Sequence, residues 1–288
     1  MKEMVYKQYD QAELDAQYNL RERHPEFQTH FDWYDAESAR ARETLDCRLD
    51  VAYGDAPLEN LDVFPALNPG SPVLVFIHGG YWQGMDKGAF AFPARTFVPA
   101  GAAYISVNYT LAPQEGIDVM VAQVRRALGW VHANAPSFNG DPERIHVSGH
   151  SAGGHLTGMM LITDWEAEGM PGALVKSGCA ISGLFDLEPI RLCYLNQVVG
   201  MDAETSHRNS PLYHIPARGV PLVAVVGGEE TDEFLRHNGM MATAWGARGF
   251  SCEKMSMPGL NHFSVVQELL RPDSPLTLAQ LKLLGLSA

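Results

Sequence analysis

Ser151 lies in a sequence pattern that is typical of a nucleophilic serine. It is the third residue of GHSAGG (149–154), which follows the apolar run RIHVSG and precedes a segment with helical spacing. In such a strand-to-helix turn the nucleophile is lifted above the sheet, and the residues two positions away are small because strand and helix approach closely. The amide of Ala152 then points toward the oxyanion that forms on an attacked carbonyl. The pattern predicts acyl transfer through Ser151.

A serine hydroxyl becomes an effective nucleophile only when a neighbouring base takes its proton. Chains that carry this turn place the histidine after the serine, with an acid between them. His262 lies in a loop between the last predicted strand and a helix, so it should lie at the carboxyl end of the sheet. His237 falls in a helical run and is expected at the surface, and His207 and His214 fall in an irregular segment. We therefore expect His262 to be the base.

Three carboxylates are candidates for the acid that orients His262 and stabilises its protonated form. The strand PLVAVVG ends at Gly227, and the position three residues later is Glu230. Both glutamate and aspartate serve in this role, so Asp232, two residues further on, is the main alternative. Asp186, after the preceding strand, is a third. We place Glu230 first.

The loop HGGYW (78–82), at the end of the strand VLVFIH, is suited to hold an oxyanion. Two consecutive glycines let the backbone turn its amides into a cavity without obstruction by side chains. Gly79 and Gly80 would supply two N–H donors and Ala152 a third, each worth ~3 kcal/mol of transition-state stabilisation. His78 is expected to orient this loop through a hydrogen bond rather than to act as a base.

Three aromatic residues flank the predicted catalytic groups. Tyr81 and Trp82 follow the two glycines, and Phe263 follows the predicted base. We expect them to bind an aromatic or apolar part of the substrate, with packing in the core as the alternative for Trp82.

The elements that position these residues form an α/β pattern from Pro72 onward. The expected strands are VLVFIH, AYISVNY, RIHVSG, VKSGCAIS, PLVAVVG and SCEKMSM, and the expected helices are 117–134, 152–163 and 232–248. Apolar strands that alternate with helices indicate a largely parallel sheet buried on both faces, with its site at the carboxyl ends of the strands.

Other segments surround this α/β pattern. The runs CRLDVAY and NLDVFP predict a β-hairpin. Residues 1–45 predict a helical arm that packs beside the site or at a homodimer interface, and 186–218 predict a small lid. We expect the whole chain, 1–288, to form a single domain.

The composition limits the partners. The 288 residues are 46% hydrophobic and 19% charged, with a formal net charge of −13 and no basic cluster. A small-molecule acyl substrate is therefore expected, rather than a nucleic acid or a membrane. Four scattered cysteines without a CxxC pair, and an N-terminus without a signal-like apolar run, predict a cytoplasmic protein with free thiols. His150 and His155 do not have zinc-motif spacing, so we expect no metal and no cofactor.

Several motifs resemble the kynurenine formamidase (arylformamidase) branch of the α/β-hydrolases, near the hormone-sensitive-lipase-like esterases. They are HGGYW, GHSAGGH, SGLFDLEPI, EETDEF, NHF and the N-terminal LDAQYNLR. One departure is Glu230, where the branch usually has aspartate.

This resemblance implies an α/β-hydrolase fold, with helices on both faces of a mostly parallel eight-stranded sheet. It also implies a serine hydrolase that cleaves a small aromatic amide or ester through an acyl-enzyme. A broad carboxylesterase of short-chain esters is the alternative. A non-catalytic binding protein is less favoured, because serine, histidine and an acid are all present.

Overall fold

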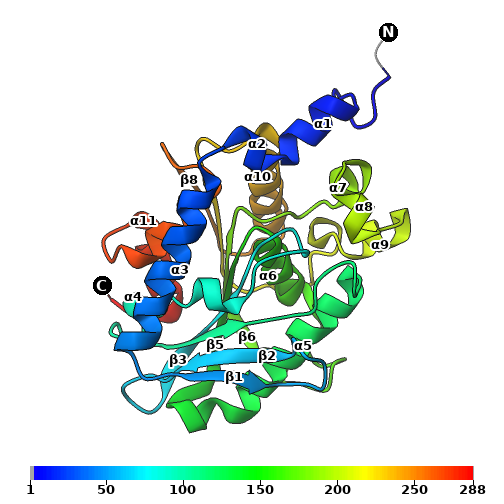
Figure 1. Ribbon diagram of the computed structural model, residues 1–288. Helices are drawn as coiled ribbons and strands as arrows, with labels where there is room; N and C mark the ends of the chain where they lie inside the picture. The colour runs from blue at the N-terminus through cyan, green and yellow to red at the C-terminus, as the bar shows by residue number, and fades with distance from the viewer. Residues whose placement is uncertain (1–2, 288) are drawn as a thin grey trace.

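An eight-stranded sheet forms the centre of the molecule, of which the computed structural model describes residues 3–287 (Figure 1). The strands are β1 Arg48–Ala52, β2 Asn60–Phe64, β3 Ser71–Ile77, β4 Ala103–Val107, β5 Gly140–His150, β6 Val175–Ile181, β7 Leu222–Gly227 and β8 Cys252–Met257. Their order across the sheet is β1-β2-β4-β3-β5-β6-β7-β8. Strands β3 to β8 run parallel, whereas β1 pairs with β2 and β2 with β4 in antiparallel fashion. The predicted mostly parallel sheet and its initial hairpin are confirmed.

The central strands are apolar along their length because both of their faces are covered. Along β3, Val73, Val75 and Ile77 pack into one hydrophobic cluster, and the alternate residues Leu74 and Phe76 pack into a second cluster on the opposite face. This period of two follows from the pleat, which directs successive side chains to opposite sides of the sheet. The sequence of a strand buried on both faces is therefore a nearly continuous apolar run.

Helices cover both faces of the sheet, as predicted. One face packs against α5 Ile117–Asn134, α6 Ala152–Ile162 and α10 Asp232–Ala247. The other face packs against α3 Phe27–Thr44, α4 Ala94–Phe97 and α11 Pro275–Leu284. The short 3-10 helices are η1 Lys87–Phe90, η2 Ala135–Phe138, η3 Pro211–Tyr213 and η4 Val265–Leu270. Among residues 3–287, every helix is too short or too polar to span a bilayer.

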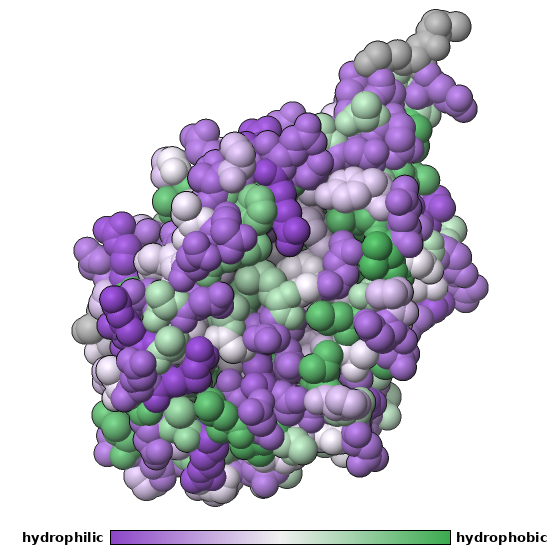
Figure 2. Space-filling model, in the orientation of Figure 1, coloured by the Kyte–Doolittle hydropathy of each residue, from purple (hydrophilic) through white to green (hydrophobic). Residues whose placement is uncertain are grey.

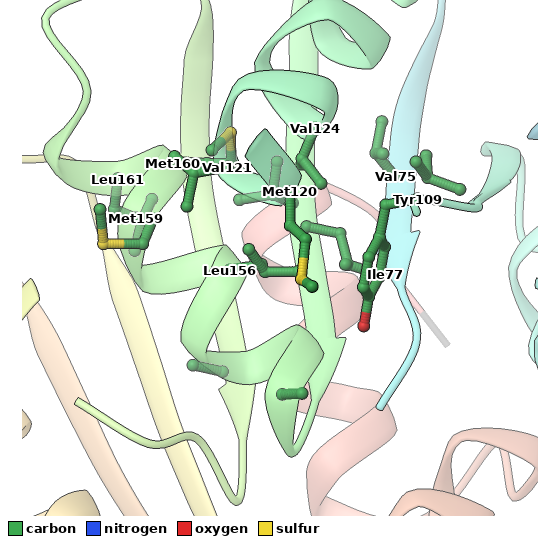
Figure 3. Packing of buried hydrophobic residues seen from close by; sticks show 14 of the residues in the cluster. Val75, Ile77, Tyr109, Met120, Val121, Val124, Leu156, Met159, Met160 and Leu161 are labelled. Atoms are coloured by element: carbon green, nitrogen blue, oxygen red, sulfur yellow. The ribbon is translucent and has the colours of Figure 1, made fainter. Parts of the chain in front are cut away.

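The contact between β3 and helices α5 and α6 holds the nucleophile turn in place. Figure 3 shows Met120 and Val124 of α5 and Leu156 of α6 directed toward Val75 and Ile77. All five side chains are fully buried, and burial of a side chain of this size contributes about 1.5–3 kcal/mol. The first turn of α6 is thereby fixed against the carboxyl end of the sheet.

The N-terminal arm meets the predicted lid above the carboxyl ends of the strands. The arm holds α1 Gln11–Tyr18 and α2 Leu20–Arg23 before α3, and 186–218 holds α7 Glu188–Leu192, α8 Asn196–Val199 and α9 Ala203–Arg208 (Figure 1). Hydrogen bonds join them, among others from Gln11 to the carbonyl of Leu192, from the amide of Tyr194 to Asp15 and from the Tyr194 hydroxyl to the Tyr18 carbonyl. The arm therefore packs onto the same molecule, over the end of the sheet that carries Ser151.

Candidate active site

Ser151 occupies the sharp turn between β5 and α6. Its backbone has φ 58° and ψ −118°, a strained conformation for a residue with a side chain. Two backbone hydrogen bonds maintain it: the Ser151 amide donates to the Ile181 carbonyl at 2.8 Å, and the Ser151 carbonyl accepts from the amide of His155 at 3.0 Å. Strain that the surrounding structure maintains in this way is common at catalytic residues.

The glycines on either side of Ser151 are required by close backbone contacts. A Cβ atom on Gly153 would lie 1.9 Å from the carbonyl oxygen of Ile77, and one on Gly149 would lie 2.3 Å from the carbonyl oxygen of Gly153. No side chain fits at those distances, so the steric reason inferred from the sequence pattern applies to this turn.

His262 and Glu230 form a buried pair beside the turn. His262 Nδ1 lies 2.6 Å from Glu230 Oε2, and both side chains are almost fully buried. The other carboxylate oxygen, Oε1, accepts hydrogen bonds from the Ser182 hydroxyl at 2.5 Å and the Gly227 amide at 2.8 Å. With Nδ1 directed at the carboxylate, Nε2 of His262 is left to interact with a nucleophile.

Ser151 and His262 both line one cavity of about 410 Å³. Among residues 3–287, the Ser151 hydroxyl forms no hydrogen bond with His262. Catalytic serine–histidine hydrogen bonds often form with good geometry only in the Michaelis or transition-state complex, so the shared cavity is the relevant observation.

The two other acid candidates lie elsewhere. Asp232 is exposed at the first position of α10. Asp186 is buried, but its carboxylate accepts from the hydroxyl of Tyr6 at 3.0 Å and from Arg236 at 3.2 Å. Glu230 is the carboxylate that contacts His262.

The glycine loop lies against the nucleophile. A Cβ atom on Gly79 would lie 3.0 Å from Cβ of Ser151, and Gly80, with φ +106°, lines the cavity. Within residues 3–287, no protein group accepts a hydrogen bond from the amides of Gly79, Gly80 or Ala152. Unpaired amides are rare in protein interiors, and of these three residues Gly80 lines the cavity.

Two further histidines support these groups. His150 lies 2.8 Å through Nε2 from the carbonyl oxygen of His262, and the two rings are 4.6 Å apart. Burial, with a smaller effect of neighbouring His262, lowers the pKa of His150 well below its usual value. His78 donates from Nδ1 to the Gly79 carbonyl at 2.8 Å and stacks on Tyr109. His78 therefore orients the loop, as its position in the sequence suggested.

Trp82 does not line the cavity, and the expectation that it binds substrate is wrong for this structure. It is fully buried in the core, and its indole N–H donates to His155 Nδ1 at 3.2 Å. His155 donates in turn from Nε2 to the Asn209 carbonyl at 2.7 Å. The alternative of core packing describes Trp82, and His155 is the partner that satisfies its buried N–H.

His237 is also not where the helical pattern placed it. It is buried rather than at the surface. Its Nδ1 accepts a hydrogen bond from the Phe185 amide at 3.1 Å, and its Nε2 lies 3.2 Å from the Tyr18 hydroxyl. Tyr18 belongs to the arm and donates to Glu233 at 3.1 Å. The arm thus covers the face of α10 that a pattern within α10 alone would assign to solvent.

A curated relative identifies the family. A kynurenine formamidase from Danio rerio is 32% identical to this chain over 255 residues, which are 86% of this chain and 85% of that protein. The chain belongs to the kynurenine formamidase family.

Other comparisons match the chain to a further family model and to proteins named as an esterase and a thioesterase. The BD-FAE family model matches residues 61–179. Esterase LipQ of Mycobacterium tuberculosis is 32% identical over 149 residues, which are 48% of this chain and 35% of LipQ. The crystal structure of a candidate thioesterase from Silicibacter sp. has a TM-score of 0.79 and 28% identity, covering 92% of this chain and 97% of that one. The protein is a hydrolase, and the predicted α/β-hydrolase fold is confirmed.

In this member of the kynurenine formamidase family, the arm supplies much of the cavity wall. Tyr81 and Phe263 line the cavity, as expected, but so do Leu20 and Phe31 of the arm and Tyr194 of the predicted lid. Figure 2 shows pale and green residues around a hollow in the middle of one face, with purple residues of the arm above it. The sequence signal for this wall was the aromatic content of the arm, which could equally have marked a dimer interface.

The site contains no evident metal-binding cluster. Among residues 3–287, no group of three or more histidine, cysteine, aspartate or glutamate side chains is arranged to hold a metal ion. His150 and His262 line the cavity that contains Ser151, and Glu230 contacts His262, a set of groups that suits acid–base and nucleophilic chemistry.

Proposed function

We propose that this protein is a serine hydrolase in which Ser151 is the nucleophile, His262 the base and Glu230 the acid that orients it. The observation that carries the proposal is the buried His262–Glu230 pair, 2.6 Å apart, whose histidine lines the same cavity as Ser151. The proposed reaction is hydrolysis of a small aromatic acyl amide. N-formylkynurenine is the first substrate to test, because the relatives that define the family are kynurenine formamidases.

The mechanism is a two-step acyl transfer. His262 accepts the hydroxyl proton as Ser151 Oγ bonds to the acyl carbon, and the amides of Gly79, Gly80 and Ala152 donate to the oxyanion. The C–N bond then breaks, and His262 gives its proton to the leaving nitrogen. Water attacks the acyl-serine ester while His262 takes a proton from it. Collapse of this second intermediate releases the carboxylic acid and returns the proton to Ser151.

The size and lining of the cavity support a small aromatic substrate. Its volume of about 410 Å³ falls within the range of ~300–1,000 Å³ that is usual for small-molecule sites. Phe31 and Phe263 lie in its wall with ring centroids 5.6 Å apart, edge to face. Segment 186–218, proposed as a small lid, adds Tyr194 and Leu195.

A carboxylesterase acting on short-chain esters is the second candidate. The similarity to esterase LipQ over 149 residues favours it. A glutamate at position 230, where the sequence resemblance leads us to expect aspartate, distinguishes this chain from the formamidase pattern. Because ester and amide hydrolysis use the same groups, only the substrates distinguish the two candidates.

The test compares turnover of N-formylkynurenine with that of p-nitrophenyl acetate and butyrate. We expect the formamide to be cleaved with the larger kcat/KM. Rapid ester turnover with no formamide cleavage would contradict the formamidase assignment and leave the esterase. Ser151→Ala should abolish both activities. Ser148→Ala is the matched control, since Ser148 is a buried serine on β5, three residues before Ser151, and does not line the cavity.

We also infer a reducing, cytoplasmic location and small-molecule partners rather than nucleic acid. All four cysteines, Cys47, Cys179, Cys193 and Cys252, are free thiols in the structure, which is usual for a cytosolic protein. The net charge of −13 opposes binding to nucleic acid. The homodimer considered from the sequence is tested by the mass of the protein in solution, measured by light scattering.

A further inference from the structure

Arg21 has an unusual position in the catalytic cavity. It lies in α2 of the arm, and it is the one residue with a permanently charged side chain among the described residues that line the cavity. The rest of the lining is aromatic, aliphatic or neutral, apart from His150 and His262. Arg21 is exposed, so solvent screens part of its charge, which still attracts an oppositely charged group within a few ångströms.

The guanidinium of Arg21 has no carboxylate partner among residues 3–287. It lies instead over two aromatic rings, with its central carbon 5.2 Å from the ring centroid of Phe27 and 5.9 Å from that of Phe31. Stacking of this kind holds a guanidinium in place while leaving its N–H donors free at the edge. Most other arginines of this acidic chain, Arg40 and Arg95 for example, pair with carboxylates.

A continuous aromatic path joins Arg21 to the catalytic histidine. The ring of His262 lies 5.7 Å from that of Phe263, which lies 5.6 Å from that of Phe31, over which Arg21 is stacked. A substrate whose scissile bond lies at Ser151 and His262 would rest its ring along this wall. A group on the far side of that ring would then reach Arg21.

We propose that Arg21 is a specificity-determining residue that binds a carboxylate carried on the aromatic part of the substrate, away from the scissile bond. The planar guanidinium matches a carboxylate with two parallel hydrogen bonds. The inference rests on the proposed function, since it assumes that the cavity is where hydrolysis occurs. The preferred substrates are then anionic aromatic amides or esters, although the protein as a whole carries a net charge of −13.

Two matched substrate pairs test this proposal. The amide pair is p-formamidophenylpropanoate and its neutral analogue p-propylformanilide. The ester pair is p-acetoxyphenylpropanoate and p-propylphenyl acetate. For each pair the measured quantity is the ratio of kcat/KM for the carboxylate over the neutral compound. We expect a ratio above one for the wild type, and a ratio at least tenfold lower for Arg21→Gln, mainly through KM.

Two further variants separate charge pairing from a structural effect. Arg21→Lys keeps the positive charge and should restore part of the ratio, because a point charge still attracts the carboxylate. Arg23→Gln is the matched control: Arg23 lies on the same helix outside the cavity lining, with its guanidinium 3.5 Å from the Glu229 carbonyl. It should leave the ratio unchanged.

A ratio of kcat/KM that is unchanged in Arg21→Gln overturns the proposal. If kcat/KM falls equally for both members of a pair, the ratio is also unchanged, and Arg21 would instead have a role in holding the arm. The two pairs also separate this proposal from the formamidase assignment. If the wild type cleaves the esters but neither formamide, the formamidase assignment fails while the ester pair still decides the role of Arg21.

Discussion

The hydroxyl of Ser182 donates a 2.5 Å hydrogen bond to Oε1 of Glu230, the oxygen of that carboxylate that does not contact His262. Ser182 is fully buried and has a positive φ of 51°, so its position is strongly constrained. The Gly227 amide donates to the same oxygen. These two donors fix the longer glutamate side chain so that Oε2 faces the histidine, and Ser182 is therefore a positioning residue.

Replacement of Ser182 should weaken catalysis without affecting substrate binding. Loss of a hydrogen bond to a charged group is worth about 1.5–3 kcal/mol, so we expect Ser182→Ala to lower kcat by roughly 10- to 100-fold, with KM little changed. Ser182→Gly is the comparison, because glycine also lacks the hydroxyl but relieves the positive φ. Equal losses of kcat in the two variants, with the glycine variant melting at a higher temperature, would assign the effect to the hydroxyl. Full activity in both would contradict it.

Substitution of the two neighbouring acids identifies which one serves the histidine. Glu230→Gln removes the charge that faces His262 and should lower kcat by about 10³- to 10⁴-fold, as loss of the orienting carboxylate does in serine hydrolases. Asp232→Asn alters an exposed residue at the start of α10 and should leave kcat within about twofold, since surface substitutions have small effects. The measurement is kcat with the best substrate found. A larger loss in Asp232→Asn would reverse the assignment.

The parts of the fold that depend on local pattern were predictable from the sequence. The strand runs from VLVFIH to SCEKMSM correspond to β3–β8, and the predicted helix 117–134 coincides with α5. The contact between Glu230 and His262 also agrees with the order expected, because both residues follow strands whose carboxyl ends meet at one edge of the sheet. Local periodicity and parallel topology were enough for these features.

Features that depend on distant segments were not predictable in this way. Trp82 points into the core because Tyr81 and Trp82 both have positive φ values, 51° and 60°, which no alternation rule anticipates. His237 is buried because the arm, more than 200 positions earlier in the chain, hydrogen bonds to it through Tyr18. The arm's part in the cavity was undecided for the same reason: its aromatic residues pack against Phe263 only in the folded molecule.

Two helical glycines should respond in opposite ways to alanine. Helix propensity alone predicts that a change from glycine to alanine stabilises a helix by about 0.5–1 kcal/mol. Gly239→Ala in α10 should do so, because a Cβ atom there meets no atom within 4 Å. Gly153→Ala in α6 should prevent folding or sharply lower Tm, since its Cβ would lie 1.9 Å from the backbone oxygen of Ile77. Thermal unfolding measures both, and a folded Gly153→Ala protein with wild-type Tm would contradict the close contact at the turn.

Mild acid should destabilise the protein through its buried histidines. Burial lowers the pKa of His78 and His155 to about 4, and that of His237 to about 3, against about 6.5 in an unfolded chain. Between these values the unfolded state binds more protons than the folded state, so stability is full above pH ~6.5 and falls as the pH decreases. Each such histidine adds a slope of up to about 1.4 kcal/mol per pH unit, and His146 and His150, whose pKa values burial also lowers, add to the total.

Urea unfolding at pH 7.5, 6.5 and 5.5 measures this slope in a range where most carboxylates stay ionised. We expect the free energy of unfolding to change little between pH 7.5 and 6.5 and to fall steeply toward pH 5.5. In His155→Gln, whose side chain retains a donor for the Asn209 carbonyl and an acceptor for the Trp82 N–H, the slope should decrease by up to about 1.4 kcal/mol per pH unit, because one proton fewer is taken up on unfolding. A free energy of unfolding that is independent of pH over this range would show that these histidines are not held neutral by burial.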